Sequence, residues 1–236
     1  MQKQNMKISG SSSMPGGNYG KVNVSGCGKV IGDIKAEQLT CSGVAKIEGT
    51  ASVGNLTCSG TCSFKEDLIV TNKAMFSGAS KVSGKCTCHH MECSGVTKLE
   101  QNLSCDTLRL SGVLKVYGGV EAETLQLDGV IGIDGLLNAE HISIRSRDCS
   151  MIKEIGCSKI QVRRGHISFW SHLFHPHRKS LETSIIECDD CELENTRADI
   201  VRGKQIIIKK GCDIRRVEYS DTCDIAKGCV QEVVKI

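Results

Sequence analysis

The sequence predicts an all-β protein, a right-handed parallel β-helix with rungs of about 17 residues. Three observations carry this prediction: a Ser-Gly pair recurs every 17 or 18 residues, apolar columns keep register with it, and apolar residues alternate with polar ones. The stretch LTCSG at 39–43 returns unchanged at 56–60. The glycines of the pair, replaced once by Asp-Gly, are Gly26, Gly43, Gly60, Gly78, Gly95, Gly112 and Gly129.

Four apolar columns follow each of these glycines at fixed offsets. They are Val30, Ile47, Phe64, Val82, Leu99, Val116 and Ile133; Ile34, Ala51, Leu68, Cys86, Leu103, Val120 and Leu137; Leu39, Leu56, Ala74, Met91, Leu108, Leu125 and Ile142; and Cys41, Cys58, Phe76, Cys93, Leu110, Leu127 and Ile144. We expect all four columns to face one core, with equivalent residues about 4.8 Å apart along the axis.

The spacing decides against other repeat folds. A helical repeat needs apolar spacings of three and four over ten or more residues, and this repeat is too short for a helix pair. Left-handed β-helices follow a hexapeptide rule with 18-residue turns, whereas the dominant interval here is 17. The right-handed form is therefore predicted. At the Ser-Gly corner, glycine fits a backbone site that needs positive φ or a close approach between rungs.

Three segments follow from the extent of the repeat. Residues 1–19 are polar and rich in Gly and Ser, which predicts a flexible N-terminal tail. Residues 20–145 form the regular β-helix. Residues 146–236 look folded but lack the strict repeat, and either continue the helix with irregular rungs or cap its end.

Composition excludes several classes of function. A net charge of +3 and an aromatic content of 3% argue against nucleic acid as a partner. No run of about 18 apolar residues exists to span a membrane. The 15 cysteines are odd in number and no signal peptide precedes them, so a cytoplasmic protein with reduced thiols is expected. The motifs GxSxG, HExxH and a phosphate-binding loop are missing, so we expect no enzyme and no cofactor.

The cysteines are interpreted mainly as core residues. Cys41, Cys58 and Cys93 share one inward column, and Cys27 is expected to face inward after its corner glycine. The stretch CTCHHMEC (86–93) has zinc-ligand residue types, but the register turns its cysteines into the core, so no metal is assigned. The pair in CDDC (188–191) has the spacing of a metal knuckle or redox site, but its acids disfavour a thiolate.

The stretch RRGHISFWSHLFHPHRK (163–179) stands outside the repeat. It is basic, rich in His, and contains the only Trp. It is expected either to cover an open end of the β-helix or to meet a partner or an anionic membrane surface. The residues assigned to this role are Arg163, Arg164, Phe169, Trp170, Leu173 and Phe174.

The repeat resembles the bactofilins, bacterial cytoskeletal proteins. The resemblance rests on VSGCGKVIGDIKAEQLTCSG (24–43), whose skeleton recurs over residues 20–145, and on ADIVRGKQIIIKKGCDIRRVEYS (198–220), which is similar to a longer Gram-positive branch. The family implies a right-handed β-helix, nucleotide-independent self-assembly into filaments, and a scaffold role in cell shape, envelope or motility. The folded region after residue 145 departs from the short tails of typical members.

The sequence therefore predicts a non-enzymatic, polymer-forming scaffold. Its partner is itself, as a filament or an end-to-end dimer, with envelope or motility proteins as further partners. Val22 and Val24 in the first rung are the predicted self-association residues. The alternatives are a monomeric β-helical adaptor that binds through its C-terminal region, and a β-helix enzyme acting on carbohydrate or acyl groups.

Overall fold

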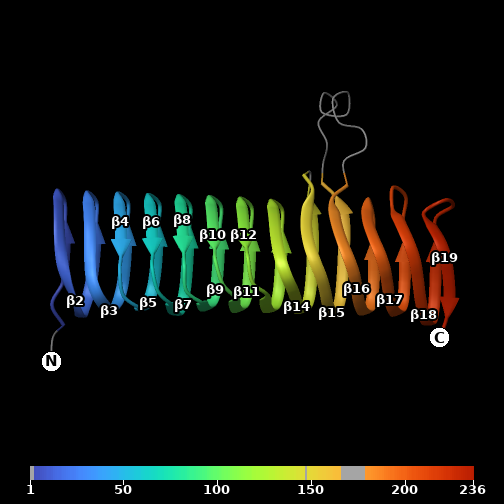
Figure 1. Ribbon diagram of the computed structural model, residues 1–236, viewed down its shortest axis with the longest axis horizontal. Coiled ribbons are helices and arrows are strands. Elements are labelled where there is room, and N and C mark those ends of the chain that lie inside the picture. The colour runs from blue at the N-terminus through green and yellow to red at the C-terminus, as the bar shows by residue number, and fades with distance from the viewer. Residues whose placement is uncertain (1–2, 147, 166–178) are drawn as a thin grey trace, which may run out of the picture. The chain divides into compact units, whose positions relative to one another are not determined.

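The computed structural model describes residues 3–146, 148–165 and 179–236, and every helix or strand in those ranges is a β-strand (Figure 1). The chain divides into two compact units, Met1–Glu121 (unit 1) and Ala122–Ile236 (unit 2), and strand β13 (Val120–Leu127) crosses the division. The paired strands within each unit are parallel and stack in rungs. The predicted all-β, parallel β-solenoid is confirmed, and its right-handed sense stays a prediction.

Unit 1 alternates short and long strands. The strands are β1 (Met6–Ile8), β2 (Ser11–Val24), β3 (Cys27–Cys41), β4 (Val44–Ile47), β5 (Ala51–Cys58), β6 (Thr61–Phe64), β7 (Leu68–Phe76), β8 (Ala79–Val82), β9 (Cys86–Cys93), β10 (Val96–Leu99), β11 (Leu103–Leu110) and β12 (Val113–Val116). The short strands β4, β6, β8, β10 and β12 stack on one another, and so do the long strands β5, β7, β9 and β11 (Figure 1). In β5 and β9 the alternation breaks where two successive residues face outward, so each long strand supplies two sides of the rung.

The four predicted columns form the core. Every residue of the four columns is buried, from Val30 in β3 to Ile144 in unit 2. A further inward column, two residues after each corner glycine, was not predicted because its chemistry varies from rung to rung. Its members are Ala45, Cys62, Ser80, Thr97, Leu114 and Ile131, all buried.

The Ser-Gly corner explains the most regular feature of the sequence. A Cβ on Gly43 would lie 2.1 Å from the carbonyl oxygen of Gly26, and a Cβ on Gly60 would lie 1.9 Å from that of Gly43. Neither glycine has a positive φ. Of the two reasons considered for glycine here, close approach between rungs is therefore the one that applies. The amide of Val44 donates to the Gly26 carbonyl at 2.9 Å, which holds the rungs together at this point.

A second corner repeats a side-chain contact between rungs. Asp33 Oδ1 accepts a hydrogen bond from the Thr50 amide at 2.8 Å, and Asp67 Oδ1 accepts one from the Lys85 amide at 2.8 Å. Asn102 Oδ1 accepts from the Gly119 amide at 3.0 Å in the same manner. Each carboxylate or amide thereby satisfies a backbone N–H that the turn leaves unpaired.

The structure corrects the flexible tail predicted for residues 1–19. Strand β1 and most of β2 lie in this segment, and Met6 and Ile8 pair in register with Val22 and Val24. Tyr19 is buried and its hydroxyl donates to the Pro15 carbonyl at 3.0 Å. The polar composition misled the prediction because the outward positions of a solenoid are polar in any case, and only every second residue has to be apolar.

Unit 2 uses longer strands, β14 (Val130–Ser146), β15 (Ser150–Arg164), β16 (Leu181–Leu193), β17 (Thr196–Ile208), β18 (Asp213–Ile225) and β19 (Val230–Lys235). Of the two arrangements considered for residues 146–236, the described part forms rungs. The rungs beyond β16 are shorter than in unit 1, since Leu181 pairs with Thr196 and Arg197 pairs with Asp213. Within the described ranges, no helix is long and apolar enough to cross a lipid bilayer.

Candidate functional site

The thiol column Cys41, Cys58 and Cys93 lies in the core of unit 1, as predicted. All fifteen cysteines are unbridged. Cys41 Sγ donates to the Gly43 carbonyl at 3.5 Å, and Cys93 Sγ donates to Thr97 Oγ1 at 3.3 Å. A hydrogen bond with Cys62 and burial raise the pKa of Cys41, and burial raises the pKa of Cys93. These thiols are packed as neutral core groups and are poor nucleophiles.

Cys27 does not share this environment, which corrects one expectation. It is exposed, like Val44, Val96 and Val113, which occupy the same position after the corner glycine. The apolar character of this column suggested an inward position. The inward side chain is instead the next residue, such as Ala45.

The stretch CTCHHMEC forms β9, with its cysteines inside and His89 and His90 outside. His89 Nδ1 lies 2.6 Å from Asp106 Oδ2, and this contact raises the pKa of His89. Cys105 on β11 pairs with Cys88. Among the residues that the structure describes, no group of three or more His, Cys, Asp or Glu side chains is arranged to hold a metal ion.

The CDDC pair lies on β16 in unit 2. Cys188 and Cys191 are buried, and Cys188 pairs with Cys157 of β15. The hydrogen bond from Cys157 lowers the pKa of Cys188, but the contact with Cys191 and burial outweigh it and leave that pKa raised. Asp189 points outward and lies 3.0 Å from Lys204 Nζ. The geometry does not favour a reactive thiolate at this pair.

The basic stretch 163–179 is only partly described. Phe169, Trp170, Leu173 and Phe174 lie outside the described residues. Arg163 and Arg164 end β15, where Arg163 lies 3.8 Å from Glu192 and the Arg164 amide donates to Glu194 at 3.2 Å. Three strands, β17 to β19, follow β16 in unit 2. The two arginines therefore belong to an internal rung.

The predicted self-association residues Val22 and Val24 are inside the core, because β1 covers them. The free edge of unit 1 is β1 itself. Ile8 directs its carbonyl at β2, where it accepts hydrogen bonds from the Ser25 and Gly26 amides. Successive residues of a strand direct their backbone groups to opposite sides, so Lys7 directs its N–H and C=O away from β2.

The last strand of unit 2, β19, is apolar on the side that continues the core. Val233 pairs with Val217 of β18, yet the exposed fraction is 48% for Val233 and 0% for Val217. Ile236 follows, with an exposed fraction of 65%. A core column that ends exposed in this way leaves apolar area available for another strand.

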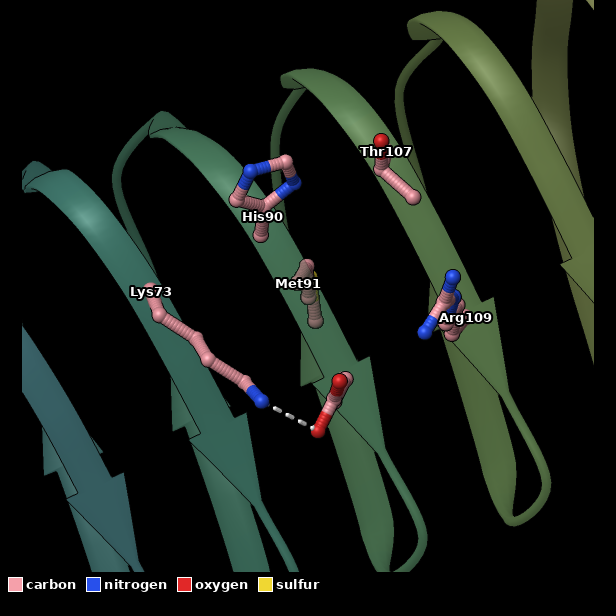
Figure 2. A pocket seen from close by; sticks show the side chains of 6 residues that line it. Lys73, His90, Met91, Thr107 and Arg109 are labelled. Atoms are coloured by element: carbon pink, nitrogen blue, oxygen red, sulfur yellow. Dashed lines mark ion pairs between the residues drawn. The ribbon is translucent and has the colours of Figure 1, made fainter.

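A hollow of about 220 Å³ lies on the outer face of β7, β9 and β11 in unit 1 (Figure 2). It is lined by Lys73, His90, Met91, Glu92, Thr107 and Arg109. Lys73 Nζ forms an ion pair with Glu92 Oε2 at 2.8 Å, drawn as the dashed line in Figure 2. With cationic and hydroxyl groups outnumbering its one carboxylate, the hollow suits an anionic group. Sequence reasoning missed it, because only strand register brings Lys73, His90 and Thr107 side by side.

A second hollow, of about 460 Å³, lies on unit 2. Gly203 causes it, because it follows Cys157 and Cys188 in their column and carries no side chain. A Cβ on Gly203 would lie 2.4 Å from the Cys188 carbonyl oxygen. Arg202, Lys204, Glu187 and Asp189 surround it with balanced charge.

Comparison with known proteins finds relatives for part of the chain. No family model and no solved structure matches it. The chain is 42% identical over 79 residues to the uncharacterized proteins YhbF and YhbE of Bacillus subtilis (strain 168), which covers 34% and 32% of this chain respectively. The match covers 32% of the length of each relative, so the two relatives are longer than the part they share with this chain.

Proposed function

We propose that this protein is a bactofilin-like, non-enzymatic cytoskeletal scaffold that self-associates through the ends of its β-solenoid. The observation that carries the proposal is the exposed end of the core at β19, where Val233 lacks the cover that buries Val217. An exposed apolar column beside a free strand edge is a template for a further strand. The resemblance in residues 20–145 to a filament-forming family agrees with this.

The free edge of β1 supports the same proposal from unit 1. Lys7 offers an unpaired N–H and C=O, and Met6 is only partly covered. Pairing of β1 with β19 of another copy would give filaments, whereas pairing of two β1 edges would give an end-to-end dimer. In the bacterial cytoplasm such a scaffold would support cell shape, envelope or motility assemblies.

The test compares two substitutions of exposed apolar residues in unit 2. Val233→Asp places a charge in the proposed junction, where burying it is costly, and shortens or abolishes filaments seen by negative-stain microscopy. Met151→Asp makes the same chemical change on the outer face of β15, where Met151 is exposed, and leaves assembly as in the wild type. Equal assembly of both variants would contradict the junction at β19.

A strictly monomeric wild-type protein would remove the scaffold proposal. In that case the alternative is a monomeric adaptor that binds a partner through unit 2, for which the exposed β19 is the available apolar surface.

A further inference from the structure

One outer face of unit 1 combines two regular columns, and we call it the valine–lysine face. It consists of the outward residues of β4, β6, β8, β10, β12 and the start of β3. The column next to the Ser-Gly corner is Cys27, Val44, Thr61, Ala79, Val96 and Val113, and the column two residues further on is Lys29, Lys46, Ser63, Lys81, Lys98 and Lys115. From first to last rung the face is roughly 24 Å long.

The exposure of the first column is not required by the fold. The side chains of Val44, Val96 and Val113 are exposed to 50%, 58% and 42%, although any polar residue fits an outward position. The inward neighbours Ala45, Thr97 and Leu114 supply the core beneath them. An apolar column retained on the outside indicates a surface that is covered by something else.

The lysine column is also costly to the isolated protein. Like charges opposite each other on adjacent strands repel, and here they lie about 4.8 Å apart along the axis. Glu48 lies 2.9 Å from Lys29 and 2.8 Å from Lys46, and Glu100 lies 2.8 Å from Lys81. These two carboxylates reduce the repulsion, but Lys65 adds to the column, so the lysines on this face remain in excess.

An aromatic ring completes the face at its far end. Tyr117 is about half exposed, and its ring centroid lies 4.7 Å from Lys98 Nζ and 5.2 Å from Lys115 Nζ. Tyrosine with its hydroxyl end wet and its ring against apolar surface is enriched where a lipid bilayer meets water.

From this combination we propose that the valine–lysine face binds the surface of an anionic phospholipid bilayer. The ammonium groups meet lipid phosphates, and Val44, Val96, Val113 and Tyr117 reach the headgroup region beneath them. Lysine suits this arrangement because its long stem lies along apolar surface while the charge stays in the headgroup layer. The inference goes beyond self-association, since it uses an outer face and neither β1 nor β19.

Charge complementarity decides against two other occupants. A second copy laid on the same face would place lysine against lysine. A linear polyanion would engage the ammonium groups but would leave the valine column in water, which gives no reason for the valines to be there. A bilayer surface is flat, negative and apolar underneath, and so fits both columns.

The experiment measures co-sedimentation of the whole protein with vesicles of phosphatidylcholine containing phosphatidylglycerol, and with pure phosphatidylcholine. The test variant is Lys81→Gln, Lys98→Gln and Lys115→Gln together. Its control, Lys21→Gln, Lys35→Gln and Lys85→Gln, removes the same charge from exposed positions on other sides of unit 1. Unchanged circular dichroism melting establishes that both variants fold.

The wild type and the control are expected to bind the anionic vesicles, and the test variant to bind about ten-fold more weakly or less. Val44→Ser with Val96→Ser is expected to weaken binding further at high salt, where charge attraction is screened. No binding by the wild type, equal loss in test and control variants, or binding to heparin with no binding to vesicles would each overturn the proposal.

Discussion

Gly60 lies so close to Gly43 that a Cβ on Gly60 would be 1.9 Å from the Gly43 carbonyl oxygen. The same contact joins every pair of successive Ser-Gly corners from Gly26 to Gly112, and the obstacle in each case is backbone. The repeat that made the fold readable from sequence therefore marks the places where rungs approach most closely.

Gly60→Ala is expected to destabilise the protein by at least about 2 kcal/mol, because the backbone of two rungs has to separate. The control is Gly10→Ala, at the equivalent corner of the first rung, where a Cβ meets nothing within 4 Å. Urea unfolding followed by circular dichroism compares the two midpoints. A similar midpoint for both variants would show that the corners are not tightly packed.

Ser80→Ala is expected to stabilise unit 1 by about 1 kcal/mol, since Ser80 Oγ is buried without a hydrogen-bond partner. Thr97→Val in the same inward column serves as the opposite case. Thr97 Oγ1 accepts a hydrogen bond from Cys93, so its removal leaves that thiol unpaired and lowers stability. Urea midpoints that fall for both variants would contradict this assignment.

Native-state thiol labelling is expected to show one fast cysteine, Cys27, which is the exposed member of the fifteen. The half-buried thiols react more slowly. For Cys157 a hydrogen bond with Cys188 and burial raise the pKa, and for Cys223 burial raises it. Cys27→Ser should remove the fast phase. Rapid reaction of half of the thiols would contradict the packed core.

Glu218 is expected to make folding stability depend on pH. Arg202 Nε donates to Glu218 Oε2 at 2.7 Å, and Arg216 Nε forms an ion pair with Oε1 at 2.8 Å without hydrogen-bond geometry. The bond from Arg202 is the main cause that lowers the pKa of Glu218 below its ordinary value of 4.5. A lowered folded-state pKa means that this contribution is present above pH 4.5 and is lost as pH falls through the folded-state value.

The measurement is the urea midpoint across an acid titration. Glu218→Gln should lower the midpoint at neutral pH and flatten its fall below pH 4.5. Glu140→Gln, at an exposed position of β14, should leave the curve as in the wild type. Parallel curves for wild type and Glu218→Gln would exclude the role of this ion pair.

Much of the fold could be predicted because the core repeats. Leu39, Leu56 and Leu108 lie at one offset from their corner glycines, and alternation at period two fixed their inward direction. The N-terminal strands were missed because residues 1–19 lack the corner repeat, and only pairing with Val22 and Val24 reveals Met6 and Ile8 as core.

The candidate surfaces were less accessible to prediction. Cys27 and Val44 are apolar yet point outward, so residue type alone assigned them to the wrong side. The hollow at Lys73, His90 and Arg109 arises from three strands whose outward residues have no shared pattern in sequence. Its existence follows from register, which single-sequence reasoning had fixed only for the inward columns.

Sedimentation velocity over a range of concentrations tests the central claim, self-association through the solenoid ends, most directly. The wild type should form larger species as concentration rises. Lys7→Pro removes the N–H on the free edge of β1 and should weaken this association at least about ten-fold, whereas Lys7→Ala keeps the N–H and should associate like the wild type. A wild type that stays monomeric at every concentration and salt, or equal association of both variants, would contradict the account.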